Sequence, residues 1–196
     1  DLLKNIRSTG IKAITLPEDD SLISVLETRG NGEIMIGTKF GLAIRFSENQ
    51  IRPMGRSAYG VRGIRFKKAS DEVVSVVEVD ESSTIFTVTE KGYGKCAPCS
   101  DYRLQARGGS GIINVRSGSK NGRVVSLNRL SEKQDVILVT DTGRTIRFRS
   151  SNIPVQKRGG LGVKLMGLRE GEVISGVAIV EEGEIIEGVD VVDGNE

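Results

Sequence analysis

The sequence predicts an all-β, propeller-like fold of four-stranded blades that repeat about every 51 residues, and three observations support this prediction. Glycines recur at a fixed spacing of 51 in two series: Gly41, Gly92 and Gly143, and Gly60, Gly111 and Gly162. Short runs rich in β-branched residues recur in phase with these glycines, separated by turn residues. Helical periodicity is absent. Repeated four-stranded units of about this length are typical of propeller blades.

The expected strands follow from the β-branched runs in chain order. In the first period they are 11–16, 21–28, 33–37 and 42–46; in the second, 61–66, 72–79, 84–89 and 93–97; in the third, 112–116, 123–130, 135–140 and 144–149; in the last, 163–168 and 172–180. The connections TKFG, EKGYG and TDTG join the third and fourth strands of successive periods. Gly41, Gly92 and Gly143 take the same place in these connections and suit the left-handed position of a three-residue hairpin loop.

Two further features constrain how the strands are arranged. The run VILV at 136–139 is apolar on consecutive residues, so we expect that strand to be covered on both faces. The connection from each fourth strand to the next first strand, such as 45–61, is too long for a hairpin. We therefore expect it to cross between blades.

Charge is distributed unevenly along the 196 residues, whose formal net charge is +2. All 28 Lys and Arg lie in residues 1–169 with 17 acids, so this part carries a net charge of +11. Residues 170–196 hold nine acids and neither Lys nor Arg. A basic body of this kind is typical of proteins that bind a polyanion, although a solvated surface remains the alternative. We expect a repeat array over 1–180 and an acidic tail over 181–196 that competes with the polyanion for the basic surface.

Cations also recur in phase with the repeat, on the fourth strand, on the crossing connection and on the strand that follows it. With two glutamines beside them, the candidate DNA-binding residues are Arg45, Arg52, Arg56, Arg62, Lys95, Arg103, Gln105, Arg107, Arg147, Arg149, Gln156, Lys157, Arg158 and Lys164. Equivalent positions of blades arranged around an axis share one rim. We therefore expect a cationic track that contacts the phosphates of bent double-stranded DNA without reading bases. Neighbouring glycines either admit phosphate to backbone N–H groups or serve turn geometry.

The segments MGRSAYGVRGIRF (54–66) and TVTEKGYGKC (87–96) resemble the blade motifs in the C-terminal domain of the A subunit of bacterial DNA gyrase, and each repeat carries a version of both. The resemblance implies a β-pinwheel of strand-exchanged blades that wraps DNA around a basic outer edge and so directs negative supercoiling. It further implies the remainder of the A subunit of gyrase and the B subunit of gyrase as partners, with the active sites of the ATP-dependent topoisomerase outside this chain. The blade count is lower than the family's usual number, so we expect blades to be missing at the N-terminal end.

The family's wrapping motif, a QRRGGKG-type box, has two degenerate relatives here. QKRGGLG at 156–162 has Leu161 in place of the final cation, and QARGGSG at 105–111 has Ala106 and Ser110 in place of two cations. The resemblance therefore implies that the principal box lies upstream of this chain.

Several chemistries are not expected. The chain has no His, which removes the commonest general base. Cys96 and Cys99 alone cannot complete a tetrahedral zinc site. We therefore predict no catalytic residue, no metal site and no cofactor. We also see no apolar run long enough for a membrane span and no export signal, so we expect a cytoplasmic protein.

Three alternatives to a gyrase DNA-wrapping module remain open at this point. They are a propeller that serves as a protein-interaction scaffold, the equivalent domain of topoisomerase IV, and a glycan-processing enzyme. The last would need paired carboxylates in a central pocket, and the acids do not form a repeated pair.

Overall fold

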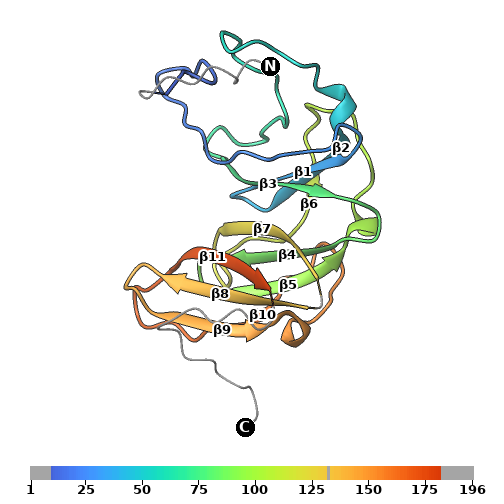
Figure 1. The fold of residues 1–196 in the computed structure, drawn as a ribbon. Coiled ribbons are helices and arrows are strands. Elements are labelled where there is room, and N and C mark those ends of the chain that lie inside the picture. Colours follow the sequence, from blue (N-terminus) through green and yellow to red (C-terminus); the bar gives the residue numbers. More distant parts are fainter. Residues whose placement is uncertain (1–9, 132, 182–196) are drawn as a thin grey trace.

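The computed structural model describes residues 10–131 and 133–181, and every regular element in these ranges is a β-strand or a single 3₁₀ turn. The strands form three sheets that are stacked one above another (Figure 1). No helix in the described ranges is long and apolar enough to cross a membrane. The all-β prediction is confirmed.

The first sheet has the strand order β3-β1-β2-β6. β1 (Glu33–Thr38) and β2 (Leu42–Ser47) form an antiparallel hairpin. β3 (Val73–Val79) pairs with β1, and the two-residue β6 (Ile112–Ile113) pairs with β2.

The second sheet repeats this arrangement one period later in the order β7-β4-β5-β10. β4 (Thr84–Thr89) and β5 (Tyr93–Pro98) form the hairpin, with β7 (Val124–Leu130) and β10 (Val163–Lys164) on either side. Each strand begins one full period after its counterpart in the first sheet, as β4 at residue 84 does after β1 at residue 33. The period read from the glycines is therefore the period of the sheets.

The third sheet contains β11 (Ile174–Glu181), β8 (Gln134–Thr140) and β9 (Thr145–Arg149) in the order β11-β8-β9. A 3₁₀ turn follows the second hairpin strand of each sheet: η1 (Glu48–Gln50), η2 (Cys99–Asp101) and η3 (Ser150–Asn152).

Strands are exchanged between periods, and this differs from a blade of four consecutive strands. Each of the first two sheets combines the hairpin of one period with the second strand of the next period and the first strand of the period after that. Thus β3 pairs with β1 rather than with β4, which follows it after only four residues. All copies have the same apolar pattern, so the pattern fixes which face is buried but not which copy supplies the partner strand. Strand exchange agrees with what the gyrase resemblance implied.

Some expected strands are shorter than predicted or do not form. The segments 11–16, 21–28 and 61–66 contain no assigned strand, and the strands expected at 112–116 and 163–168 have two residues each. Extended segments become strands only where a partner accepts their backbone hydrogen bonds. Sequence pattern overestimates strand length wherever that partner is short or absent.

Two apolar layers hold the three sheets together. Between the first and second sheets lie Met35, Ala43, Ile85, Ala97 and Leu127, all with no exposed surface. The layer between the second and third sheets is built mainly from Phe86, Val88, Val136 and Leu138. Ile137, between Val136 and Leu138, is also buried, which confirms that both faces of this strand are covered.

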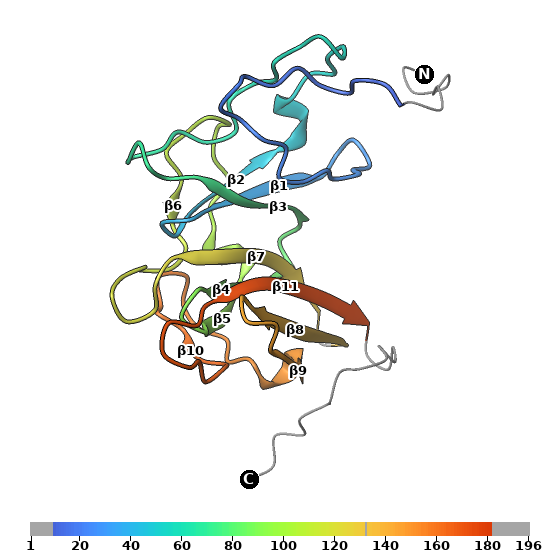
Figure 2. The ribbon, with the colours of Figure 1, turned by 90° about the vertical axis from the view of Figure 1, so that its left-hand side faces the viewer.

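The two edges of each sheet have different surroundings. We call the edge formed by β3, β7 and β11 the inner edge, because β7 packs against both β3 and β11. Figure 2 shows these three strands together, with β6 and β10 on the opposite side. We call that opposite side the outer edge.

The hairpin glycines adopt the predicted conformation. Gly41, Gly92 and Gly143 have φ angles of +85°, +77° and +84°. A Cβ atom at Gly92 would in addition lie 2.6 Å from the carbonyl oxygen of Met166. Both the backbone angle and the close approach therefore require glycine there.

Candidate nucleic-acid interface

Two loops return from one sheet to the outer edge of the preceding sheet, and we call residues 103–111 and 154–162 the strap loops. The first leads from η2 to β6, and the second leads from η3 to β10. The Gln105 N–H donates to the Arg45 carbonyl oxygen at 2.8 Å, and the Gln156 N–H donates to that of Cys96 at the same distance. Both boxes therefore lie along the second hairpin strand of the sheet before them.

The box arginines attach each strap loop to the backbone of its neighbours. Arg107 donates through Nε to the carbonyl oxygen of Gln50 at 3.0 Å and through Nη1 to that of Arg62 at 2.6 Å. Arg158 makes the equivalent bonds to the carbonyl oxygens of Asp101 and Ile113. Two of five guanidinium N–H groups are used in each case, and both residues are only half-buried. The other three N–H groups of each guanidinium make no side-chain hydrogen bond to the described residues.

The glutamines and the last box glycines shape the loop itself. Gly111 and Gly162 have φ angles of +66° and +84°, and a Cβ atom would lie 2.7 Å and 2.6 Å from the carbonyl oxygens of Ala43 and Gly94. Gln156 accepts the Gly162 N–H through Oε1 at 3.2 Å. At these positions turn geometry and close packing on the strand explain the glycines, so phosphate access is not needed to account for them.

Three of the candidate cations are buried, so the expectation that they belong to an exposed track is wrong for them. Arg45, Lys95 and Arg147 are 5%, 1% and 5% exposed. They lie on the second hairpin strand of each sheet, β2, β5 and β9, and in β2 and β5 four consecutive residues are buried, so both faces of these two strands are covered.

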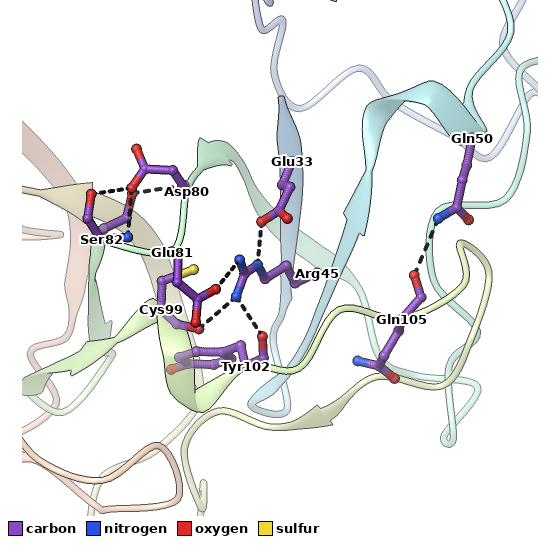
Figure 3. Close-up of polar contacts among 10 residues, drawn as sticks. Glu33, Arg45, Gln50, Asp80, Glu81, Ser82, Cys99, Tyr102 and Gln105 are labelled. Atoms are coloured by element: carbon purple, nitrogen blue, oxygen red, sulfur yellow. Dashed lines mark hydrogen bonds and ion pairs between the residues drawn. The ribbon is translucent and has the colours of Figure 1, made fainter. Parts of the chain in front are cut away.

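Arg45 is held by acids and carbonyl groups at the interface between the first and second sheets (Figure 3). Its Nε lies 2.5 Å from Glu33 and its Nη2 lies 2.6 Å from Glu81. Nη1 donates to the carbonyl oxygens of Cys99 and Tyr102 at 3.2 and 3.1 Å. A buried charge with this set of partners serves to join two sheets.

Lys95 and Arg147 have comparable structural roles. Lys95 donates through Nζ to the carbonyl oxygens of Lys157 and Arg158 at 3.2 and 2.5 Å. These bonds hold the second strap loop against β5. Burial lowers the pKa of Lys95 to about 8. Arg147 pairs with Asp135, the Nε–Oδ2 distance being 2.8 Å.

The remaining candidate cations are accessible. Arg107 and Arg158 are half-buried, and the other seven are exposed: Arg52, Arg56, Arg62, Arg103, Arg149, Lys157 and Lys164. Those that lie on or beside the strap loops, β6 and β10 form what we call the outer cationic edge: Arg62, Arg103, Arg107, Lys157, Arg158 and Lys164. Arg107 and Arg158 occupy equivalent places on two successive sheets, and Arg62 and Lys164 stand at the same offset from a repeat glycine.

A model of the family described as "DNA gyrase C-terminal domain, beta-propeller" matches residues 1–29, 32–80, 83–131 and 134–181. The last three matches begin at residues 32, 83 and 134, which is the period of the sheets. The chain belongs to the DNA gyrase C-terminal domain family. The resemblance carried by residues 54–66 and 87–96 is thus confirmed.

Relatives within the gyrase family are similar over most of the chain. The A subunit of DNA gyrase from Staphylococcus epidermidis is 40% identical over 176 residues, which are 89% of this chain and 20% of that protein. The A subunit of DNA gyrase from Staphylococcus aureus is 40% identical over 178 residues, which are 90% of this chain and 20% of that protein. The chain spans about a fifth of the length of the curated relatives it matches.

Solved structures show the same fold. The structure of a DNA gyrase A C-terminal domain superposes with a TM-score of 0.78 at 26% identity, covering 88% of this chain and 58% of that one. The C-terminal domain of DNA topoisomerase IV superposes with a TM-score of 0.86 at 23% identity, covering 92% and 56%. The second likeness concerns the fold alone.

Sequence reasoning missed one group of cations in this gyrase-family chain. Lys68 and Arg123 lie over the Phe40 ring, with Lys68 Nζ 5.0 Å and Arg123 Cζ 5.7 Å from its centroid. Lys120 Nζ lies 5.9 Å from the Tyr93 ring centroid. These cations come from the connections that precede the inner strands, and they gather at the hairpin turns. The cation series predicted from the sequence came from the connections that follow the fourth strands, and these cations lie in different connections. In the sequence, only the aromatic residue at each hairpin turn could have indicated them.

The two cysteines pack in different layers of the stack. Cys96 packs in the layer between the second and third sheets, whereas Cys99 packs in the layer between the first and second. Burial raises the pKa of each thiol to about 11. Among residues 10–131 and 133–181, no three His, Cys, Asp or Glu side chains are gathered that could hold a metal ion.

Proposed function

We propose that the chain is a non-catalytic module of a type II topoisomerase, the A subunit of DNA gyrase, that binds double-stranded DNA and wraps it along the outer cationic edge. The observation that carries this proposal is the equivalence of Arg107 and Arg158, which stand at the same place on two successive sheets with part of each guanidinium accessible. Arg103, Lys157 and Lys164 add exposed charge on the same edge.

The mechanism follows from where the charge lies. Cations repeated at one place on successive sheets contact successive phosphates only if the duplex follows the stack, so each additional contact favours a bent path. Because phosphate contacts carry no sequence information, binding depends on DNA length and salt rather than on base sequence. A bent segment of fixed handedness would bias the strand passage carried out by the rest of the enzyme.

The remaining partners follow from the family. We propose that the chain works together with the remainder of the A subunit of gyrase and with the B subunit of gyrase in the bacterial cytoplasm, and that the catalytic residues lie in those parts. The equivalent role in topoisomerase IV is a second candidate, tested by whether wrapping introduces negative supercoils.

A protein-interaction scaffold is a third candidate, which one observation favours. Leu104 and Val155 are 52% and 66% exposed and stand at equivalent places in the two strap loops. Exposed apolar side chains interleaved with cations also suit a protein partner.

One experiment separates a DNA-wrapping module from a protein-interaction scaffold. A relaxed plasmid is incubated with the chain, treated with a topoisomerase that relaxes free DNA, and analysed for its linking number. We expect the linking number to shift by an amount that grows with protein concentration. In a plot of the logarithm of the binding constant for duplex DNA against the logarithm of the salt concentration, the slope should be about −0.9 for each phosphate that the chain neutralises. A duplex of about ten base pairs should bind much more weakly than one of about a hundred, since a short duplex cannot follow the stack. Unchanged linking number, with salt-insensitive binding, would contradict the proposal.

A further inference from the structure

The hairpin turns lie at one end of the strands, which we call the turn end. At each turn, the connection that leads to the inner strand of the same sheet lies alongside the turn. The Glu90 N–H donates to the Arg123 carbonyl oxygen at 2.8 Å, and the Asp141 N–H donates to that of Val173 at 3.0 Å. The turn and the connection of each sheet form what we call its turn group: 38–42 with 63–72, 89–93 with 114–123, and 140–144 with 165–174.

The three turn groups differ in charge. The first contains four cations and two acids, the second contains four cations and one acid, and the third contains two cations and three acids. Their formal net charges are therefore +2, +3 and −1. The positive charge of the turn end belongs to the first and second sheets and is lost at the third.

Five cations of the first two turn groups are available to an anion. All five are exposed, and none forms an ion pair with a residue in 10–131 or 133–181. In the third turn group, by contrast, Arg144 is paired with the buried Glu172, the Nη1–Oε2 distance being 2.6 Å. We call the five cations the turn patch: Lys67, Lys68, Arg116, Lys120 and Arg123.

Aromatic rings hold part of this patch in place. Lys68 and Arg123 lie over the Phe40 ring, and Lys120 lies over the Tyr93 ring. The face of an aromatic ring attracts a cation without neutralising its charge. These cations are therefore positioned at the hairpin turns and keep their full charge for a ligand.

The connection 114–123, which supplies three cations of the turn patch, is fixed to two neighbouring turns. Ser117 Oγ donates to the carbonyl oxygen of Phe40, in the first turn, at 2.9 Å. Lys91 Nζ donates from the second turn to the Ser119 carbonyl oxygen at 2.6 Å. The connection therefore bridges the first two sheets at their turn end.

The turn patch adjoins the outer cationic edge. Asn121 Nδ2 donates to the carbonyl oxygen of Leu161, in the second strap loop, at 3.4 Å. Lys164, which belongs to the outer cationic edge, is the pairing partner of Tyr93, over whose ring Lys120 lies. The two sets of cations therefore form one surface that passes from the outer edge to the turn end.

The opposite end of the first two sheets has a different charge. Asp80, Glu81 and Asp101 are exposed there, in the connection from β3 to β4 and in η2. Arg129, at the same end, is paired with Asp80, the Nη2–Oδ2 distance being 3.3 Å. Phosphates on the outer edge are therefore attracted towards the turn end and repelled from the opposite end.

We propose that the turn patch binds phosphates of the wrapped duplex and places the duplex at the turn end of the first two sheets but not of the third. The duplex then crosses the outer cationic edge obliquely instead of staying at one height along the stack. A path at one height has no handedness, whereas an oblique path is part of a helix, so the patch contributes to the sense of wrapping. This inference rests on the proposed function and deepens it by assigning five further phosphate contacts.

The position of the duplex is tested with a DNA-cleaving label on single cysteines. An iron chelate that generates hydroxyl radicals is attached to Ser119→Cys at the turn end, or to Ser82→Cys, an equally exposed serine at the opposite end. The native Cys96 and Cys99 are buried and so do not compete for the label. With a duplex of about a hundred base pairs, long enough to follow the stack, and at equal fractions bound, we expect several-fold more cleavage from residue 119.

The oblique path is tested with the same label on Glu170→Cys. Residue 170 stands one period after residue 119, in the third turn group. Because the third turn group has no free positive charge to offset its acids, we expect the label at 170 to cleave the duplex several-fold less than the label at 119.

The charge of the patch is tested by a pair of matched double variants. Lys120→Gln with Arg123→Gln should lower the salt slope of duplex binding by about two, because two phosphate contacts are removed. The control, Arg129→Gln with Lys133→Gln, also removes one Arg and one Lys, but at the opposite end of the strands, and should leave the slope unchanged.

Three results would overturn this inference and leave the proposed function standing, provided that the chain still binds duplex DNA. They are equal cleavage from residues 119 and 82, equal cleavage from residues 119 and 170, and equal salt slopes for the two double variants. The last result, together with no cleavage from residue 119, would assign the turn patch to a protein partner. Absence of duplex binding by the unsubstituted chain would instead contradict the proposed function itself.

Discussion

The strap-loop arginines combine a structural task and a proposed binding task in one side chain. Arg107 and Arg158 each use Nε and one Nη to hold backbone carbonyl oxygens of neighbouring elements. Lysine could supply the charge but not the fork, because an ammonium group has no fixed planar geometry. Structure and charge can therefore be separated at these positions by substitution.

Arg107→Lys is expected to lower the free energy of unfolding by about 1 kcal/mol, through loss of the paired bonds to carbonyl oxygens. The salt dependence of DNA binding should hardly change, because the charge is kept. The matched variant Arg103→Gln, at an exposed cation without this fork, should leave stability unchanged and reduce the salt slope by about one. Urea unfolding and duplex binding at several salt concentrations measure both. Identical behaviour of the two variants would show that the distinction is wrong.

Lys95 gives the stability a pH dependence with a definite sign. Burial lowers its pKa to about 8 from an ordinary 10.5, so between these values the unfolded state binds more protons than the folded state. Stability contributed by this group therefore rises with pH in that window and is constant below it. We expect the stability of the chain relative to Lys95→Met to increase from pH 8 to pH 10. The comparison cancels the contributions of Cys99 and Tyr102, whose raised pKa values act in the opposite direction.

The positions of the cations along the chain could be predicted, but their burial could not. The spacing of 51 residues predicted that Arg107 and Arg158 occupy equivalent positions in the repeat, and in the structure they make equivalent hydrogen bonds in the two strap loops. It failed for Arg45, because both faces of β2 are covered and no alternation in the sequence marks a solvent face, and for Arg147, because Asp135 on the neighbouring strand β8 holds its side chain. Glu81, which compensates Arg45, is distant in sequence and could be found only from the fold.

At the scale of elements, each strap loop depends on a glycine that lies against a strand. Gly162→Ala combines a φ of +84° with a Cβ 2.6 Å from the Gly94 carbonyl oxygen, so we expect a loss of about 1–3 kcal/mol of stability. Gly159→Ala is the control in the same loop, because a Cβ there meets nothing within 4 Å and its φ is not positive. Urea unfolding distinguishes them. Equal losses would mean that the loop as a whole, not this contact, resists substitution.

Hairpins were the most predictable elements and strand partners the least. A three-residue connection ending in glycine determines its own pairing, so β1–β2 and β4–β5 follow from sequence. The partner of β3 does not, because the same apolar pattern recurs in every period. The segment 21–28 has the pattern of an inner strand and is not assigned as one. The apolar pattern of a segment shows that it can form a strand, but whether the strand forms depends on a partner strand being available.

At the scale of the whole molecule, the separation of charge along the chain leads to a prediction about the C-terminal residues. Residues 182–196, which lie outside the described ranges, hold six acids and no cation. Ending the chain at Glu181 should tighten duplex binding at about 50 mM salt by roughly threefold to tenfold and have little effect at high salt, because the competition is electrostatic. The control keeps the tail length but changes its acids to Gln and Asn. If this neutral tail weakens binding as much as the acidic one, bulk rather than charge is responsible.

Strand exchange has a consequence for how such an array changes in evolution. The first sheet extends from residue 33 to 113 and the second from 84 to 164, so consecutive sheets share a stretch of sequence. One period of sequence, which is the unit that is duplicated or lost, therefore does not correspond to one sheet, because a sheet contains strands from several periods. An in-frame duplication or deletion of one period joins equivalent points wherever it begins, so a hairpin inside the array still has a strand to pair with on each side, as in the first two sheets. The array can lengthen or shorten by single recombination events without passing through a broken intermediate.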